Sequence, residues 1–203
     1  MSRSVVLASN NVKKLAELRR IVTPLVPGLE VLGLADVAAY DEPAETEPTF
    51  AGNALLKARA CVAATGLPAL ADDSGLCVDA LNGMPGVLSA RWSGVTGPDK
   101  DRANNALLLA QIADVPDARR AARFVCVIAL CLPDGTEIVE QGEMPGRILR
   151  TEHGGGGFGY DPLFAATGYD VSTAELDPAE KDRISHRGHA LAAIAPRIAA
   201  ALG

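Results

Sequence analysis

The order of the apolar segments is the feature that most constrains the fold of this chain of 203 residues. An apolar run (residues 4–9) precedes a segment with helical periodicity (13–26), and a second apolar run follows, which is typical of alternating strands and helices. Further on, two long strand-like segments (121–132 and 136–149) flank a Pro-Asp-Gly turn signal and predict a hairpin. Parallel pairing early and antiparallel pairing in the middle together predict an α/β fold with a mixed sheet.

Capping and turn residues delimit the other expected elements. Thr49 begins a helix that Gly66 ends, and a short helical stretch is expected from Ser172 or Thr173 through the DPAEKDR segment. The polar residues 72–75 are expected to interrupt a strand. The remaining predictions are strands at 30–34, 69–81 and 162–166 and helices at 99–113 and 185–202. The apolar face of the first helix is expected to hold Leu15, Leu18, Val22 and Leu25.

Composition and charge exclude several classes of protein. Hydrophobic residues make up 48% of the chain and charged residues 22%, as in ordinary globular proteins. The net charge of −6 argues against a general nucleic-acid surface, which would be basic. No apolar run approaches the roughly 20 residues of a membrane span. We therefore expect a cytoplasmic protein with four buried, reduced cysteines: Cys61, Cys77, Cys126 and Cys131.

A glycine-rich stretch, GGGGFGYDPLF at 154–164, contains the pattern G-x-G-x-x-G that is typical of dinucleotide-binding folds. That interpretation needs a helix directly after the last glycine, and Pro162 disfavours a helical conformation at Asp161. A flexible loop is the simple alternative. However, Phe158 and Tyr160 offer stacking faces, and glycines let a backbone approach a flat ligand closely. The stretch is therefore better interpreted as a ligand-contacting loop.

The first strand-to-helix junction is a candidate anion site, because free N–H groups and the helix dipole favour negative charge there. The candidate residues of this junction are Ser9, Asn10, Asn11, Val12, Lys13 and Lys14. Taken alone, however, the junction is explained as well by Asn11 capping a helix and the lysines facing solvent.

Two adjacent carboxylates, Asp72 and Asp73, lie inside the apolar run LPALADDSGLCV. Burying them would be costly without cations nearby, and on a strand they would point to opposite faces. A carboxylate there could bind Mg²⁺ or accept a proton from an attacking water. The alternative is a turn with both aspartates in solvent, which the apolar flanks disfavour.

A basic cluster is expected at the start of the last helix, where cations oppose the helix dipole unless an anion lies between them. An anion site and a solvated basic turn remain equally open. The cluster comprises Lys181, Arg183, Ser185, His186 and Arg187.

Six motifs in order resemble the Ham1, or inosine triphosphate pyrophosphatase, family over essentially the whole chain. They are SNNVKKLAEL (9–18), TFAGNALLKA (49–58), ADDSGLCVDAL (71–81), GVLSARWSG (86–94), GGFGYDPLF (156–164) and SHRGHAL (185–191). The resemblance implies an elongated mixed β-sheet flanked by helices, forming one domain (1–203) of two lobes with a central substrate cleft. It also implies a homodimer that hydrolyses ITP, dITP and XTP to monophosphate and pyrophosphate, using Mg²⁺.

The resemblance also assigns roles to particular residues. Asp73 is implied as proton acceptor and metal ligand, with Ser74 beside the substrate. Glu45 is implied as a second metal ligand, although Glu42 or Glu47 could take that place, and the role of Asp72 stays open. Phosphates are implied at residues 9–14, and base and phosphates at Phe158, Gly159, Tyr160, Asp161, Lys181, His186 and Arg187.

Two other functions remain compatible with the sequence. A Maf-like pyrophosphatase would act on modified pyrimidine nucleotides, and a nucleotide-binding sensor would bind without catalysis. The adjacent aspartates argue against the sensor, because a pure binding module gains little from groups that repel phosphates.

Overall fold

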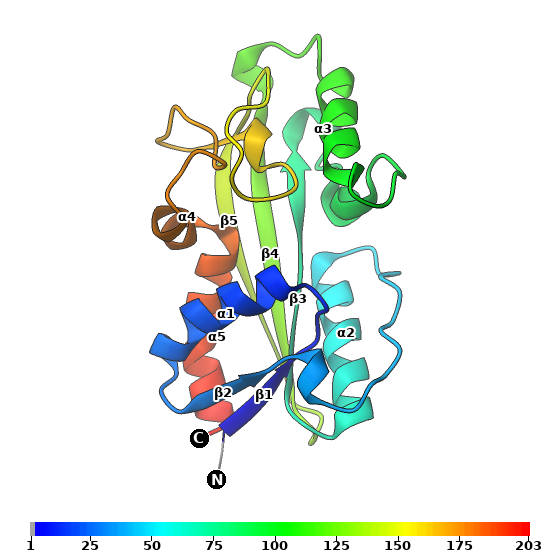
Figure 1. Ribbon diagram of the computed structural model, residues 1–203, viewed down its shortest axis with the longest axis vertical. Helices are drawn as coiled ribbons and strands as arrows, with labels where there is room; N and C mark the ends of the chain where they lie inside the picture. Colours follow the sequence, from blue (N-terminus) through cyan, green and yellow to red (C-terminus); the bar gives the residue numbers. More distant parts are fainter. Residues whose placement is uncertain (1–2) are drawn as a thin grey trace. The chain divides into compact units, whose positions relative to one another are not determined.

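The structure, a computed structural model, describes residues 3–203, apart from the side chains of Val12, Lys13 and Glu17. Within these residues one sheet has the strand order β2-β1-β3-β4-β5-β6 (Figure 1). The strands are β1 (Arg3–Leu7), β2 (Leu29–Leu32), β3 (Ala69–Val78), β4 (Ala121–Cys131), β5 (Glu137–Ile148) and β6 (Phe164–Ala166). The helices are α1 (Val12–Leu25), α2 (Phe50–Thr65), α3 (Lys100–Gln111), α4 (Pro178–Ile184) and α5 (His186–Ala201).

The sheet is mixed, as the sequence predicts. Strand β1 pairs in parallel with β2 and with β3, whereas β5 pairs antiparallel with β6. Strands β4 and β5 are neighbours joined by a turn in which the Leu132 amide donates to the Thr136 carbonyl at 2.9 Å. The expected α/β class and the expected hairpin are both confirmed.

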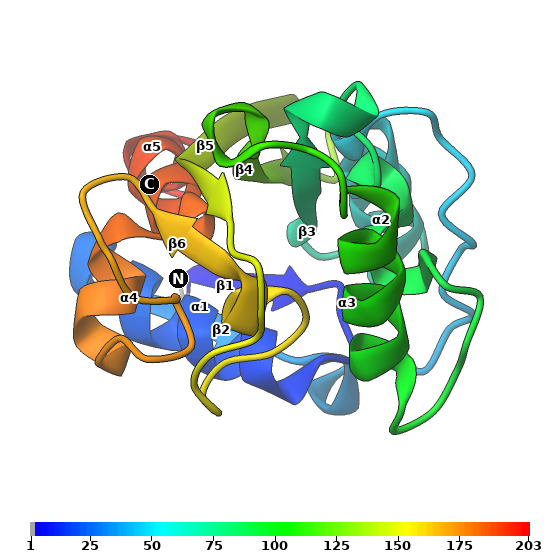
Figure 2. The same cartoon turned by 90° about the horizontal axis from the view of Figure 1, so that it is seen from above.

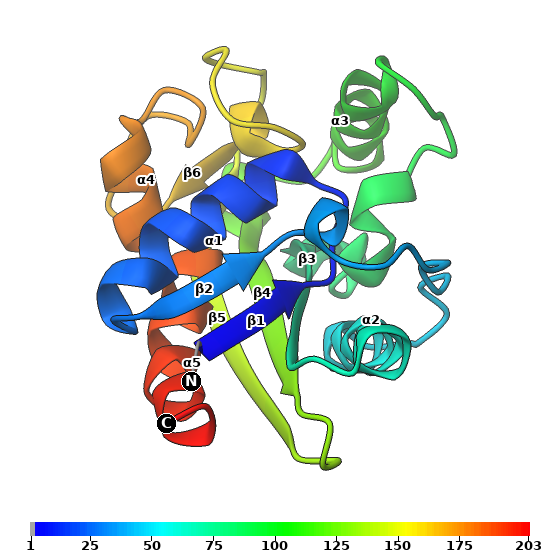
Figure 3. The ribbon, with the colours of Figure 1, turned by 60° about the horizontal axis from the view of Figure 1, so that its bottom comes forward.

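The chain divides into two compact units. The first contains the residues up to Asp73, Cys126–Gly142 and Arg187–Gly203. Its apolar core joins Leu18 and Val22 of α1 to Leu191 and Ile194 of α5, over strands that include β1 and β2. Helices α1 and α5 therefore cover one side of these strands, and α2 lies on the other (Figure 3).

The second unit contains Ser74–Val125 and Glu143–His186. Its core is built from the ends of three strands, helix α3 and the short β6, with Phe164 fully buried. The rings of Phe124 and Phe164 meet edge to face with centroids 4.7 Å apart, an arrangement that aromatic pairs favour. This core supports the glycine-rich loop, because Tyr160 and Leu163 belong to it.

Three local predictions are wrong. Leu25 is 48% exposed and does not share the buried face of Leu18 and Val22, since it is the last residue of α1. Strand β3 runs unbroken through the polar residues 72–75. The short helix near 172 begins only at Pro178, where Asp177 caps it and proline occupies the first turn.

Other predictions hold. Thr49 caps α2 by accepting a hydrogen bond from the Gly52 amide at 3.0 Å, and α2 ends at Gly66. The four cysteines are free and buried. Among the described residues, none of the helices has both the length and the apolar character required to cross a membrane.

Candidate active site

Two buried carboxylates in the middle of β3 form the centre of the site, and both belong to the first unit. Asp72 and Asp73 are 5% and 6% exposed. Successive side chains of a strand point to opposite faces, so the two carboxylates meet different partners. The predicted alternative, a turn with both aspartates in solvent, is excluded.

Asp72 is held by two cations from the two helices that share one side of the strands. Its carboxylate lies 2.9 Å from the Lys14 ammonium of α1 and 3.3 Å from the Arg187 guanidinium of α5. Burial would raise the pKa of Asp72, but the positive charges of Lys14 and then Arg187 outweigh burial and hold the pKa well below its usual range. Asp72 is therefore a permanent anion that fixes two cations.

Asp73 meets a different set of groups, from α2. Asn53 donates its side-chain amide to Asp73 Oδ2 at 3.0 Å, and the Lys57 ammonium lies 4.0 Å from Asp73 Oδ1. Burial raises the pKa of Asp73, and the negative charge of Glu45 raises it further. The positive charge of Lys57 lowers this pKa, but the net change is upward. A carboxylate with a raised pKa is a stronger base, which suits a proton acceptor.

Glu45 is the acidic loop residue that the structure joins to Asp73. The Lys57 ammonium lies 2.8 Å from Glu45 Oε1, so Lys57 contacts both carboxylates. By contrast, Glu42 accepts a hydrogen bond from the Asn10 side chain, and Glu47 uses its backbone amide to bind Asn53. Of the three candidates in this loop, Glu45 is the one whose carboxylate shares a cation, Lys57, with Asp73.

The donor chemistry around Lys57 fits a hard cation. Among the described residues, no group of three or more His, Cys, Asp and Glu side chains could hold a metal by itself. Mg²⁺, however, is commonly held by one or two carboxylates together with substrate phosphates and water. The position between Asp73 and Glu45 already attracts a positive charge, that of Lys57, which supports a fit to Mg²⁺.

The first strand-to-helix junction confirms the predicted cap but not the predicted solvent-facing position of Lys14. Asn11 does cap α1, since its Oδ1 accepts the Lys14 amide at 3.3 Å, and Ser9 Oγ accepts the Asn11 amide at 3.2 Å. Lys14 is not a solvated residue, because it pairs with Asp72. The predicted side chains of Val12 and Lys13 lie outside the described part of the structure.

The glycine-rich loop belongs to the second unit and is organised by Asp161. Asp161 Oδ2 accepts the Phe158 amide at 2.8 Å and lies 2.5 Å from the Lys181 ammonium, while Thr173 donates to Oδ1 at 3.0 Å. Phe158 is 41% exposed, and the Lys181 ammonium lies 5.6 Å from the centroid of its ring. The loop therefore presents one aromatic face beside a cation.

Other predicted residues of this unit have structural contacts. The Tyr160 side chain is buried, and its hydroxyl donates to the Ser89 carbonyl at 2.9 Å, so any ligand contact of Tyr160 would come from its backbone. His186 stacks on Phe124 with ring centroids 5.0 Å apart. Ser74 directly follows Asp73 on β3 and is partly exposed.

The predicted basic cluster at the start of the last helix is wrong in part. Lys181 and Arg183 lie in the last turn of α4, where cations favour the helix dipole. Arg183 pairs with Glu180, while Arg187, in the first turn of α5, is 3% exposed and faces Asp72. Of this cluster, the charge that opposes the helix dipole is therefore that of Arg187 at the start of α5. The buried Asp72 carboxylate offsets it.

Sequence reasoning missed Asn53 and did not connect Lys57 with Asp73. Asn53 and Lys57 are four residues apart, so they lie on one face of α2, and Asn53 is fully buried. A buried asparagine in a helix needs a polar partner. The signal was thus the i, i+4 polar pair inside the otherwise apolar motif TFAGNALLKA.

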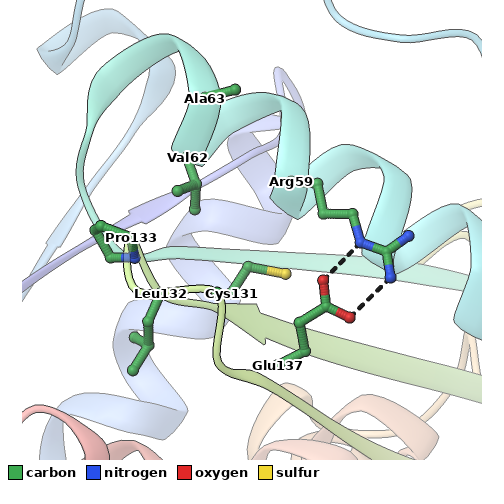
Figure 4. Close-up of a pocket in the computed structure, with 8 residues that line it drawn as sticks. Arg59, Val62, Ala63, Cys131, Leu132, Pro133 and Glu137 are labelled. Atoms are coloured by element: carbon green, nitrogen blue, oxygen red, sulfur yellow. Dashed lines mark hydrogen bonds and ion pairs between the residues drawn. The ribbon is translucent and has the colours of Figure 1, made fainter.

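A surface pocket of the first unit lies elsewhere (Figure 4). Its charged residues, Arg59 and Glu137, neutralise each other through two hydrogen bonds of 2.6 and 2.7 Å. None of the sequence-predicted site residues lines it. We therefore place the chemistry at β3 and not in this pocket.

The fold defines an α/β protein with two groups of candidate ligand-binding residues: buried carboxylates beside cations in the first unit, and a partly exposed aromatic ring beside a lysine in the second. The comparison with known proteins agrees with this class. The chain belongs to the Ham1 family, whose model matches residues 5–197.

Individual relatives span nearly the whole chain. A dITP/XTP pyrophosphatase of Nocardia farcinica is 62% identical over 197 residues, covering 97% of this chain and 95% of the relative. The crystal structure of a dITP/XTP pyrophosphatase from Mycobacterium abscessus is 54% identical with a TM-score of 0.79, covering 95% of this chain and 99% of that one. A HAM1 protein structure from Coxiella burnetii is 38% identical with a TM-score of 0.87, covering 96% and 98%. These neighbours confirm the expected fold class.

Proposed function

We propose that this chain hydrolyses the non-standard purine nucleotides ITP, dITP and XTP to the nucleoside monophosphate and pyrophosphate. The observation that carries the proposal is the buried Asp73, which has a raised pKa and lies beside Asn53 and Lys57. The relatives from Nocardia farcinica and Mycobacterium abscessus are both named dITP/XTP pyrophosphatases, which supports the substrate class. The family match spans both units, so we treat residues 1–203 as one functional domain of two lobes.

Asp73 acts as the proton acceptor for a water that attacks the α-phosphate. Its carboxylate is oriented by the hydrogen bond that the Asn53 amide donates to Oδ2. Lys14 and Arg187, fixed by Asp72, supply positive charge for the phosphates and the leaving pyrophosphate. Ser9, Asn10 and Asn11 at the start of α1 add polar groups for the same phosphates.

Mg²⁺ would be held by Asp73 and Glu45. When bound there, the ion would neutralise phosphate charge and polarise the phosphoryl group. Lys57 contacts both carboxylates and keeps their charge balanced. Burial works against the charged form of Lys57, but Asp72, Glu45 and Asp73 outweigh burial and raise its pKa.

Phe158 would stack on the purine, and the Lys181 ammonium lies over the Phe158 ring, 5.6 Å from its centroid. The amides of Phe158 and Gly159 already donate to Asp161 and Asp101, at 2.8 and 2.9 Å. These two N–H groups are therefore engaged and do not serve the carbonyl at purine C6 in this conformation.

The proposal predicts both the products and their metal dependence. With Mg²⁺, we expect pyrophosphate release from ITP, dITP and XTP at rates about a hundredfold or more above those with ATP or dTTP, because the carbonyl at purine C6 accepts hydrogen bonds that the adenine amino group cannot accept and a pyrimidine stacks over a smaller area. Removing the metal with EDTA should abolish turnover without unfolding the protein. Separate assays of pyrophosphate and orthophosphate, together with a thermal melt, check this.

The same panel separates the alternatives. Orthophosphate as the sole product would reject the proposed cleavage site. Turnover of modified pyrimidine nucleotides alone would favour the Maf-like function. Binding of ITP without product at high enzyme and Mg²⁺ concentrations would favour the sensor.

Gly157→Ala should weaken purine binding, because Gly157 has a φ of +72° and an added Cβ would meet the Asp161 carboxylate and the Lys181 ammonium. We expect the KM for ITP to rise roughly tenfold, as displacement of a charged hydrogen-bonded pair implies. The matched control is Gly155→Ala in the same loop, where an added Cβ meets nothing within 4 Å. Equal KM values for the two variants would contradict the proposed role of the loop.

A cytoplasmic homodimer is part of the proposal, since it is what the family resemblance implies. The partner of the site is a small nucleoside triphosphate, and neither nucleic acid nor a membrane is required. Light scattering of the purified protein tests the dimer directly.

A further inference from the structure

Helix α3 holds the glycine-rich loop through the peptide groups on both sides of Gly159. Asp101 Oδ2 accepts the Gly159 amide at 2.9 Å, and the Asn105 side-chain amide donates to the Gly159 carbonyl at 3.2 Å. The two residues are four apart and share one face of α3. Figure 2 shows α3 in green and the loop after β5 in yellow, both parts of the second unit.

A third residue of α3 reaches the loop by an indirect route. Asn104 donates to the Ser89 carbonyl at 3.3 Å, and the same carbonyl accepts the Tyr160 hydroxyl at 2.9 Å. Asn104 Oδ1 accepts the Ser93 amide at 2.8 Å, so its position is fixed. Gly159 and Tyr160 are thus both held, directly or through Ser89, by one face of α3.

Stability alone does not explain the burial of the Asn105 side-chain amide. Asn105 is only 3% exposed, and in the part of the chain that the structure describes its carbonyl oxygen Oδ1 has no hydrogen-bond partner. A buried amide that is half satisfied costs stability, whereas an apolar side chain would not. The hydrogen bond that Asn105 does make is the one to Gly159.

We propose that Asp101 and Asn105 are positioning residues for purine recognition. They fix the two peptide groups that flank Gly159 and thereby set the direction of the Phe158 ring, which precedes it. The inference rests on the proposed function, in which Phe158 stacks on the base. It concerns the base alone, because the residues to which the proposed function gives the phosphates belong to the first unit: Ser9, Asn10, Asn11, Lys14 and Arg187.

The test replaces the acceptor for the Gly159 amide. Asp101→Leu removes it, whereas Asp101→Asn keeps an oxygen that can accept the same hydrogen bond. Asp99→Leu is the matched control: it makes the same change two residues away, on an exposed side chain that pairs with Arg102 and gives α3 no capping bond. Each variant is assayed for the kcat and KM of ITP, the preference for ITP over ATP, inhibition by inorganic tripolyphosphate, and the melting temperature.

For Asp101→Leu we expect the KM for ITP to rise roughly tenfold or more, the effect of losing a hydrogen bond to a charged group. The preference for ITP over ATP should fall by a similar factor. The kcat and the inhibition by tripolyphosphate, which has no base, should change by less than about threefold. Asp101→Asn should recover most of the loss, and Asp99→Leu should match the wild type.

Two results would overturn the inference: an unchanged KM in Asp101→Leu, or equal weakening of ITP and tripolyphosphate, which would indicate general damage to the fold. If Asp101→Leu fails to fold, Asn105→Ala removes the donor to the Gly159 carbonyl and provides the same comparison. A wild-type protein without preference for ITP would reject the proposed function, and this inference with it. By contrast, a wild-type protein that prefers ITP, together with variants whose KM for ITP is unchanged, would reject this inference and not the proposed function.

Discussion

Replacing Asp73 by asparagine should abolish pyrophosphate release while the protein remains folded. An asparagine oxygen can still accept the hydrogen bond from Asn53, so the local packing is retained, but an amide cannot take up a proton from water. Loss of a general base typically lowers turnover by about 10² to 10⁴-fold. The kcat for ITP at saturating Mg²⁺, measured beside a thermal melt, checks this expectation.

The matched control for that variant is Asp79→Asn, which removes an exposed carboxylate just after β3. Asp79 pairs with Arg123 at 3.1 Å on the surface of the second unit and should be dispensable. Near-normal turnover in Asp73→Asn would reject Asp73 as the proton acceptor. A lower melting temperature in both variants would instead indicate that the folded protein needs both carboxylate charges for its stability.

Replacing Asp72 by alanine should lower the free energy of unfolding by about 3 to 5 kcal/mol, the usual cost of removing one partner from a buried ion pair. The reason is that the Arg187 side chain, 4% exposed, and the largely buried Lys14 would keep their charges without the carboxylate that balances them. Chemical denaturation with a two-state fit measures the change.

The control for Asp72 is an exposed ion pair. Asp117 lies 2.7 Å from Arg150, with side chains that are 78% and 49% exposed, so Asp117→Ala should cost no more than about 1 kcal/mol. If the two variants lose the same stability, then Asp72 does not organise a buried cluster. A stable Asp72→Ala protein with normal KM would also remove Lys14 and Arg187 from the proposed phosphate site.

The sequence predicts most of the fold, because the fold depends on local signals. Strands such as β4 are continuous apolar runs, and Thr49 and Gly66 delimit α2 by their own chemistry. The errors lie where tertiary contacts override local preference. Residues 72–75 carry turn-forming side chains, yet β3 stays extended because each aspartate finds a partner from a helix.

The site could be predicted only in part, for the same reason. The motif at 71–75 identifies the carboxylates, but the partners of Asp72 come from residues 14 and 187, a pairing that spacing along the chain cannot reveal. The cluster at 181–187 looked continuous, and only the break between α4 and α5 separates Lys181 from Arg187. Asp101 and Asn105 lie in none of the six motifs, so their hydrogen bonds to Gly159 required coordinates.

The bonds that Asp161 makes have a consequence for how selectivity can arise. Phe158, Lys181 and Thr173 are all tied to this one buried carboxylate by contacts within the protein itself. A segment that is already ordered loses little conformational entropy when a base arrives, so a correct and an incorrect purine bear nearly the same ordering cost. Discrimination between them must then reside in the lifetime of the complex, through unpaired polar groups on the wrong base, and only slightly in the rate of association.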